Sequence, residues 1–292
     1  MAQTIRVMTE ADFPAVDYLL QVAYASSRTY VGRLRRQLAL QPDGWLIAER
    51  DGAMVGVGGI TAMGSVGYIG LVGTAPAAQR QGIATALMRA LMAVGEGAGC
   101  TCLLLDASNA GKPLYERLGF ETVDTVTVWR READSSTGLS GDKFADEQGI
   151  ALLPYTQESV AQVAAFDASG YGAGRERVVA SFLADDPALV RLARDTAGVI
   201  QGYLILQADG DAIGPWLATS PSAARALLAW ALSFAGAHTL ITQTPGANQD
   251  GAELLTDAGF TPIRSLTHMR RGAPLSPTRR QIVYSQANLA LG

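Results

Sequence analysis

The stretch QRQGIATALM, residues 79–88, holds residue types that could bind a phosphate group. Gly82 stands just before an alanine-rich segment with helical periodicity, and the first turn of a helix leaves backbone N–H groups free at its positive end. A glycine there lets a ligand approach the backbone closely, and Arg80 and Gln81 can add side-chain donors. The stretch indicates a pyrophosphate site, with the plain start of an amphipathic helix as the alternative.

The elements around this stretch place it between a strand and a helix. Thr9 and Asp12 form a capping-box pattern that opens a helix through about residue 25. The turn Asp51-Gly52 predicts a hairpin of strands near 45–49 and 53–60. The other expected elements are a strand at about 66–74, a helix at 82–94, a buried strand at 100–106, a short helix at 111–118 and a strand at 125–129. This order predicts an α/β (α+β) fold with a mixed sheet flanked by helices.

The chain repeats itself at an offset of 140 residues. ALMRALMAVG matches ALLAWALSFA, PLYERLGF matches ELLTDAGF, and TVTVWRR matches SLTHMRR, all at that one spacing. Three matches at one offset predict two lobes of similar fold, residues 1–131 and 150–292. Residues 132–149 are polar and glycine-bearing without apolar periodicity, which is typical of a linker.

Composition favours a soluble protein that acts on a small ligand. The 292 residues carry a formal net charge of −4, and the longest basic block is RLRR, so nothing indicates nucleic acid as a partner. We find neither a signal peptide nor an apolar stretch of membrane-spanning length, and we expect a cytoplasmic protein without a membrane partner. Cys100 and Cys102 are expected to form a buried, reduced pair on one face of a strand rather than a metal site.

These features together resemble the GNAT superfamily of acyl-CoA-dependent N-acyltransferases. The pyrophosphate loop of that family reads Gln/Arg-x-x-Gly-x-Gly/Ala, and Gln79, Gly82 and Ala84 match it, with Pro76 in the place of a frequent proline. A later family motif, a tyrosine four residues before Gly-Phe, matches PLYERLGF. The motifs cover residues 3–131 in the family's order, and the second lobe more loosely resembles the C-terminal half of tandem GNAT proteins.

The resemblance implies acetyl-CoA as co-substrate, with no metal. The family's strand before the loop pairs with pantetheine and polarises the thioester carbonyl through a backbone N–H, and a turn after the next strand often contacts the cofactor through an asparagine. That last position is Ser108 here, with Asn109 next to it. The residues expected to bind the cofactor are Val72, Gly73, Thr74, Gln79, Arg80, Gln81, Gly82, Ile83, Ala84, Thr85, Ser108 and Asn109.

Acyl transfer from a thioester to an amine needs a neutral amine, donors for the oxyanion and an acid for the leaving thiolate. The motif implies that Tyr115 is the acid. VGYIGLVGT has no Glu, Asp or His, although many family members carry a carboxylate on or next to this strand. Asp106 is the nearest acidic candidate for the base; removal of the proton by water, or binding of an already neutral amine, stays open. His238 and His268 are expected to be structural.

The second lobe lacks these signatures. At the offset positions it has Thr219, Ser222 and Ala224 in place of the loop residues, and Leu255 in place of the tyrosine. We therefore expect one catalytic lobe and one supporting lobe that walls the acceptor pocket at the inter-lobe cleft. A fragment ending near residue 135 is expected to keep some affinity for CoA and to lose acceptor turnover.

The sequence thus predicts an N-acetyltransferase that moves an acetyl group from acetyl-CoA to a primary amine by direct attack in a ternary complex. A small-molecule acceptor is favoured over a protein, and the chain is expected to be a monomer or a homodimer. Two other classes stay open: an acyl-CoA-binding regulator or pseudoenzyme, and a structural tandem module without a ligand. A second helix frames acceptors in this family, and the basic residues predicted on it are Arg28, Arg33, Arg35 and Arg36.

Overall fold

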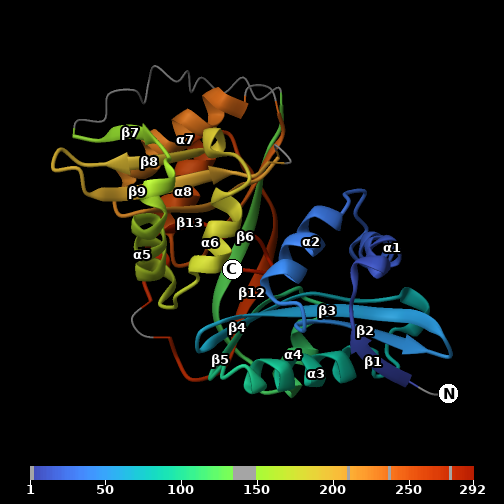
Figure 1. Ribbon diagram of the computed structural model, residues 1–292. Helices are drawn as coiled ribbons and strands as arrows, with labels where there is room; N and C mark the ends of the chain where they lie inside the picture. The colour runs from blue at the N-terminus through green and yellow to red at the C-terminus, as the bar shows by residue number, and fades with distance from the viewer. Residues whose placement is uncertain (1–2, 134–148, 209–210, 236–237, 276–277) are drawn as a thin grey trace.

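The computed structural model describes residues 3–133, 149–208, 211–235, 238–275 and 278–292 (Figure 1). Most of the expected linker lies outside these residues. The elements of the first lobe are β1 (Gln3–Val7), α1 (Phe13–Tyr24), α2 (Val31–Leu40), β2 (Trp45–Arg50), β3 (Ala53–Met63), β4 (Val66–Thr74), α3 (Ile83–Gly97), β5 (Cys102–Ala107), α4 (Lys112–Arg117) and β6 (Glu121–Arg131). Those of the second lobe are β7 (Ala151–Pro154), α5 (Val160–Tyr171), α6 (Glu176–Leu183), β8 (Val190–Arg194), β9 (Ile200–Leu206), β10 (Ile213–Ala218), α7 (Pro221–Ala235), β11 (Leu240–Pro245), α8 (Gln249–Asp257), β12 (Thr261–Gly272) and β13 (Val283–Ser285).

Local sequence signals account for the elements of the first lobe. The capping box between Thr9 and Asp12 is present and opens a short 3₁₀ turn that leads into α1. Asp51 and Gly52 both have positive φ, +51° and +81°, as the predicted two-residue hairpin requires. Each predicted element is found within a few residues of its expected bounds. The predicted fold, two lobes with mixed sheets flanked by helices, is confirmed.

Two local predictions are wrong. Arg28 precedes α2, which begins at Val31, so it does not lie on the second helix. Cys100 and Cys102 are both buried and free, but they lie on opposite faces: Cys100 packs with Leu103, and Cys102 packs with Leu104. The reason is that β5 begins only at Cys102, so strand alternation does not extend back to Cys100.

The two lobes exchange a strand. The chain forms an eight-stranded sheet in the order β1-β2-β3-β4-β5-β12-β6-β11 and a five-stranded sheet in the order β13-β10-β9-β8-β7. β5 therefore neighbours β12 from the second lobe, β11 neighbours β6 from the first, and β6 and β12 pair with each other. Figure 1 shows the two long strands running side by side between the lobes. Each lobe thus completes its sheet with a strand of the other.

Helices cover both faces of the first sheet. Figure 1 shows α1 and α2 on one face and α3 and α4 on the other. α3 lies close against β3 because β3 has glycine at position 56, where an added Cβ would stand 2.8 Å from Ile83 and 2.9 Å from Leu87. This close packing brings the first turn of α3 up to the end of β4, where the loop motif lies. No helix among the described residues is long and apolar enough to cross a membrane.

The strand exchange changes the expectation for a fragment. Residues 1–133 would lack β12, so β5 would become an open edge beside the apolar core residues Leu103 and Leu105. We expect this fragment to aggregate or to unfold without a cooperative transition. Solubility and thermal unfolding followed by circular dichroism test this, with the full chain as the control. A soluble fragment with a sharp transition would show that the first lobe does not need the exchanged strand.

Candidate active site

The loop between β4 and α3 presents free backbone donors. Gly82 is the N-cap residue of α3, with φ of +84°, and Arg80 also has a positive φ, +58°. The amide of Ala86 is the first in α3 to find a backbone acceptor, the Gly82 carbonyl at 3.0 Å. Among the hydrogen bonds of the described residues, none has a backbone amide of residues 80–85 as its donor. Several N–H groups at a helix start, with no acceptor of their own, form an anion site.

The side chain of Gln81 helps to hold the loop rather than pointing freely outward. Its Nε2 donates to the Ala77 carbonyl at 2.8 Å, and its Oε1 accepts from the Arg50 guanidinium. A second guanidinium nitrogen of Arg50 donates to the Gln81 carbonyl at 3.3 Å. Arg50 therefore adds positive charge beside the loop. Sequence reasoning missed Arg50 because it ends β2, far from the loop in the chain.

β4 and β5 separate at the point where a pantetheine arm would enter. Their parallel pairing covers only Val66 to Tyr68. Beyond it β4 carries an irregularity in its pairing with β3, and Leu71 adopts a positive φ of +51°. Val72 is half-buried, and its carbonyl accepts the hydroxyl of Tyr24, from the end of α1, at 3.1 Å. The expected strand residues Val72 to Thr74 thus border a slot with unpaired backbone along β5.

Tyr115 lies on α4, half-buried, with its ring edge-on to Phe120 at 6.1 Å between centroids. Burial raises the pKa of Tyr115 to about 12. Burial also raises the pKa of Tyr24, whose hydroxyl donates to the Val72 carbonyl. Tyr115 and Val72 both pack against the apolar core of the first domain.

The turn after β5 is exposed. Ser108 and Asn109 both face solvent, and the Ser108 hydroxyl accepts the Gly111 amide at 3.2 Å. Ser108 therefore shapes the turn that leads into α4. Both residues stay predicted cofactor contacts.

Asp106 is held inside a network of hydrogen bonds. One carboxylate oxygen lies 2.7 Å from Nδ1 of His268. The other accepts hydrogen bonds from the Tyr68 hydroxyl at 2.7 Å and from the side-chain amide of Gln286 at 2.8 Å. Burial by itself raises the pKa of Asp106, but His268 above all, with Tyr68 and Gln286, brings it below its ordinary value. The side chain is fully buried, so this carboxylate has no open path to an acceptor.

Comparison with known families decides the assignment. The sequence profile of the acetyltransferase (GNAT) family matches residues 10–120, and that of an acetyltransferase (GNAT) domain matches residues 163–285. The chain belongs to the GNAT superfamily, with two GNAT domains. A search of curated protein sequences found no matching relative.

Solved structures share the fold of this chain over most of its length. A protein assigned as an acetyltransferase from Pyrococcus horikoshii is 25% identical, with a TM-score of 0.82, over 99% of this chain and 96% of that one. A GCN5-related N-acetyltransferase from Sphaerobacter thermophilus is 16% identical, with a TM-score of 0.72, over 92% and 95% of the two chains. A tandem GNAT protein from the clavulanic acid biosynthesis pathway is 14% identical, with a TM-score of 0.62, over 94% and 99%.

The second GNAT domain has no counterpart of the loop. Residues 75–82 separate β4 from α3, whereas only Thr219 and Ser220 separate β10 from α7. Ser222 and Ala224, which the repeat aligns with loop positions, lie inside α7. The start of α7 therefore lacks the longer loop that precedes α3 and carries the predicted pyrophosphate site.

The chain itself fills the slot between β10 and β11. β13 pairs with β10 through Ser285 and Val283, and the amide of Gln286 donates to the Gln243 carbonyl of β11 at 2.8 Å. The hydroxyl of Thr244 on β11 donates to the Tyr284 carbonyl at 2.8 Å. β13 thus lies where a pantetheine arm would lie in the first domain.

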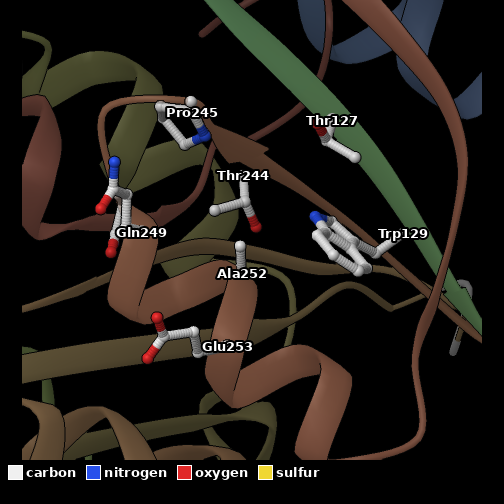
Figure 2. A pocket seen from close by; sticks show the side chains of 9 residues that line it. Thr127, Trp129, Thr244, Pro245, Gln249, Ala252 and Glu253 are labelled. Carbon is white, nitrogen blue, oxygen red and sulfur yellow. The ribbon is translucent and has the colours of Figure 1, made fainter.

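Two hollows lie outside the slot of the first domain. A cavity of about 670 Å³ lies between α2, α6 and the last residues of the chain, and Arg33, Arg35, Arg36 and Gln37 line it from α2. A smaller hollow of about 230 Å³ opens on the second domain between Trp129 of β6 and Glu253 of α8 (Figure 2). The described residues contain no group of three His, Cys, Asp or Glu side chains arranged to hold a metal ion.

Replacing Arg50 tests its part in the loop. We expect Arg50→Gln to raise the Kd for CoA about 2- to 5-fold, because an exposed charged contact contributes about 0.5–1 kcal/mol. Calorimetry at low and moderate salt measures this, and the difference should shrink as salt rises. Arg89→Gln, an exposed arginine of α3 farther along the helix, is the control and should leave the Kd unchanged. Equal Kd values for Arg50→Gln and wild type would remove Arg50 from the site.

Proposed function

We propose that this protein is an N-acetyltransferase that transfers an acetyl group from acetyl-CoA to a primary amine by direct attack in a ternary complex. The observation that carries the proposal is the set of free amides at residues 80–85, next to an unpaired slot between β4 and β5. That pair of features suits a ligand with a pyrophosphate at one end and an extended amide-bearing arm at the other.

The residues of the slot have the roles that acyl transfer requires. The amine attacks the thioester carbonyl carbon, and a backbone N–H of residues 72–74 donates to the oxygen that becomes negative. The C–S bond then breaks, and Tyr115 donates its proton to the departing thiolate. The raised pKa of Tyr115 keeps the phenol protonated at neutral pH. Burial of the CoA thiol would raise its pKa as well, which narrows the difference in pKa between the Tyr115 phenol and the thiol.

We place the acceptor in the cavity between α2 and α6. Arg36 closes one side of the cavity by contacting the second domain. Its guanidinium forms an ion pair with Asp185, just after α6, and lies 4.0 Å from the ring centre of Phe182 on α6. Arg33 and Arg35 also line the cavity. Both domains thus contribute walls, as expected for a second domain that serves the acceptor.

A binding protein without turnover is the alternative, and one observation favours it. β4 carries no acidic side chain, and the carboxylate of Asp106 is buried and fully occupied by hydrogen bonds. The enzyme and the binding protein differ in one measurable property, the release of CoA thiol that depends on an amine.

The test is a thiol-release assay with acetyl-CoA and a panel of amines: amino sugars, polyamines, amino acids, aminoglycosides and peptides with free N-termini. The proposal predicts steady release with at least one amine, together with a mass increase of one acetyl group on that amine. Tight CoA binding with no amine-dependent release across the panel would favour the regulator or pseudoenzyme.

A further inference from the structure

We propose that His268, held by Asp106, is the general base that takes the proton from the acceptor amine. The inference rests on the proposed function and names the residue that the first domain lacks on β4. His268 is on β12, so the second domain supplies the base through the exchanged strand.

The hydrogen bond between His268 and Asp106 sets the state of the imidazole. Asp106 stays ionised, because its pKa lies below the ordinary value, and an ionised carboxylate can only accept. Nδ1 of His268 therefore carries the hydrogen and donates it to Asp106 at 2.7 Å. In the neutral ring, which the proposed step requires, Nε2 is then the nitrogen with the lone pair and can accept a proton.

Nε2 of His268 is free to act. Among the hydrogen bonds of the described residues none involves Nε2, whereas Nδ1, Asp106 and Tyr68 are all engaged. About 3% of the side-chain surface of His268 is exposed, so the ring is almost fully buried. In the proposed step an amine, or a water that bridges to it, reaches Nε2.

The position of the pair fits the reaction. Tyr68 is the last residue of β4 that pairs with β5, and Asp106 comes just beyond that point, where the slot opens. His268 faces Asp106 across the β5–β12 pair, so both side chains leave the sheet on the same face. On that face Leu104 packs with residues of the second domain and with Leu291, which lines the cavity assigned to the acceptor.

Other ionisable groups surround the pair of His268 and Asp106. Asp106 lies beside the ring on β5, and Tyr68 of β4 lies with its ring 6.2 Å away. Next to these are Tyr171 of α5 and Arg280, whose guanidinium donates to Asp124 of β6 at 2.7 Å. Asp124 offsets the positive charge of Arg280, which would otherwise oppose a positive ring. Asp106 is the charged group in contact with the ring and can stabilise the imidazolium.

The proton step balances within the site. The acceptor enters as an ammonium ion, and its N–H bond breaks as Nε2 of His268 gains the hydrogen. The neutral amine then forms the C–N bond to the acetyl carbon, and the C–S bond breaks as the thiolate takes the proton of Tyr115. The second amine proton, which leaves as the amide forms, passes through solvent to the Tyr115 phenolate. The resulting imidazolium keeps its Nδ1–H donated to Asp106, which stabilises the added charge. The proton later leaves to solvent, which restores the neutral ring.

The chain offers a matched pair of variants, because it has only two histidines, His238 and His268. We expect His268→Gln to lower kcat/KM for the amine about 10²- to 10⁴-fold, with acetyl-CoA affinity unchanged. Asp106→Asn should also lower kcat/KM for the amine, and the exposed His238→Gln should behave as wild type.

A wild-type kcat/KM in His268→Gln would overturn the inference and leave the acetyltransferase proposal standing. No turnover by the wild type with acetyl-CoA bound would instead overturn the proposed function, and the inference with it. If His268→Gln fails to fold, nitrogen NMR of the wild type with ¹⁵N-labelled histidine still decides. At neutral pH we expect hydrogen on Nδ1 and none on Nε2; hydrogen on Nε2 alone would rule out the base.

Discussion

Gly82→Asp is expected to abolish acetyl-CoA binding while the protein stays folded. An added Cβ at Gly82 meets no atom within 4 Å, so the side chain fits, but its carboxylate would stand where the free amides of residues 80–85 converge. Two unit charges about 4 Å apart repel by about 4 kcal/mol at the effective dielectric near a protein surface, which is about a 10³-fold loss in affinity. Calorimetric titration with acetyl-CoA measures the loss.

Gly99→Asp is the matched control for backbone strain. Gly99 has φ of +85°, against +84° for Gly82, and an added Cβ is equally free of neighbours. Both variants place aspartate in the left-handed region, at a similar cost in stability. We expect similar thermal unfolding for the two, and normal binding in Gly99→Asp. Equal losses of affinity in both variants would show that strain, not the carboxylate at the loop, removes binding.

Tyr115→Phe is expected to lower kcat about 10²- to 10⁴-fold and to leave acetyl-CoA affinity almost unchanged. The substitution removes only the hydroxyl and keeps the ring that packs edge-on against Phe120, so the core is preserved. Single-turnover measurement of thiol release with an active acceptor gives the rate of the chemical step. At alkaline pH the wild-type rate should fall as the phenol, with its pKa raised to about 12, loses its proton.

Tyr18→Phe is the control for removing a phenol hydroxyl from this domain, because Tyr18 is 70% exposed on α1. It should turn over as the wild type does. If Tyr115→Phe keeps the wild-type rate when chemistry limits turnover, Tyr115 only packs in the core, and water protonates the thiolate.

The loop and the elements around it were predictable because their signals are local. The capping box at Thr9, the Asp51-Gly52 turn and the helical period after Gly82 each act within a few residues. The repeat likewise predicts two lobes of similar fold, and both GNAT domains were found. Local patterns are sufficient where local geometry decides the structure.

The strand exchange and its consequences were not predictable, because they depend on which distant strands pair. The repeat is satisfied equally whether β6 and β12 stay in their own lobes or cross over. Only the crossover places His268 opposite Asp106, so a histidine expected to be structural lies beside the carboxylate that the sequence offered as the base. The contact of Arg50 with the loop was not predictable for the same reason, because its partner Gln81 is far away in the sequence.

The structure of the second lobe was also only partly predictable from the sequence. The missing glycine and tyrosine predict a lobe without a loop and without an acid, but no pattern indicates that β13 fills the slot between β10 and β11. That segment has only three strand residues, and its pairing is set by side chains of β11 such as Thr244. The structure thus adds a physical reason to propose the donor site in the first domain, because β13 occupies the corresponding place in the second.

Titration of the full chain with acetyl-CoA in a calorimeter tests the central claim most directly, that one domain binds the acetyl donor and the other supports it. We predict one site per chain in the wild type, and none in Gly82→Asp. Two sites per chain, or one site that survives in Gly82→Asp, would contradict the assignment of the donor site to residues 79–85 and the closure of the second domain by β13.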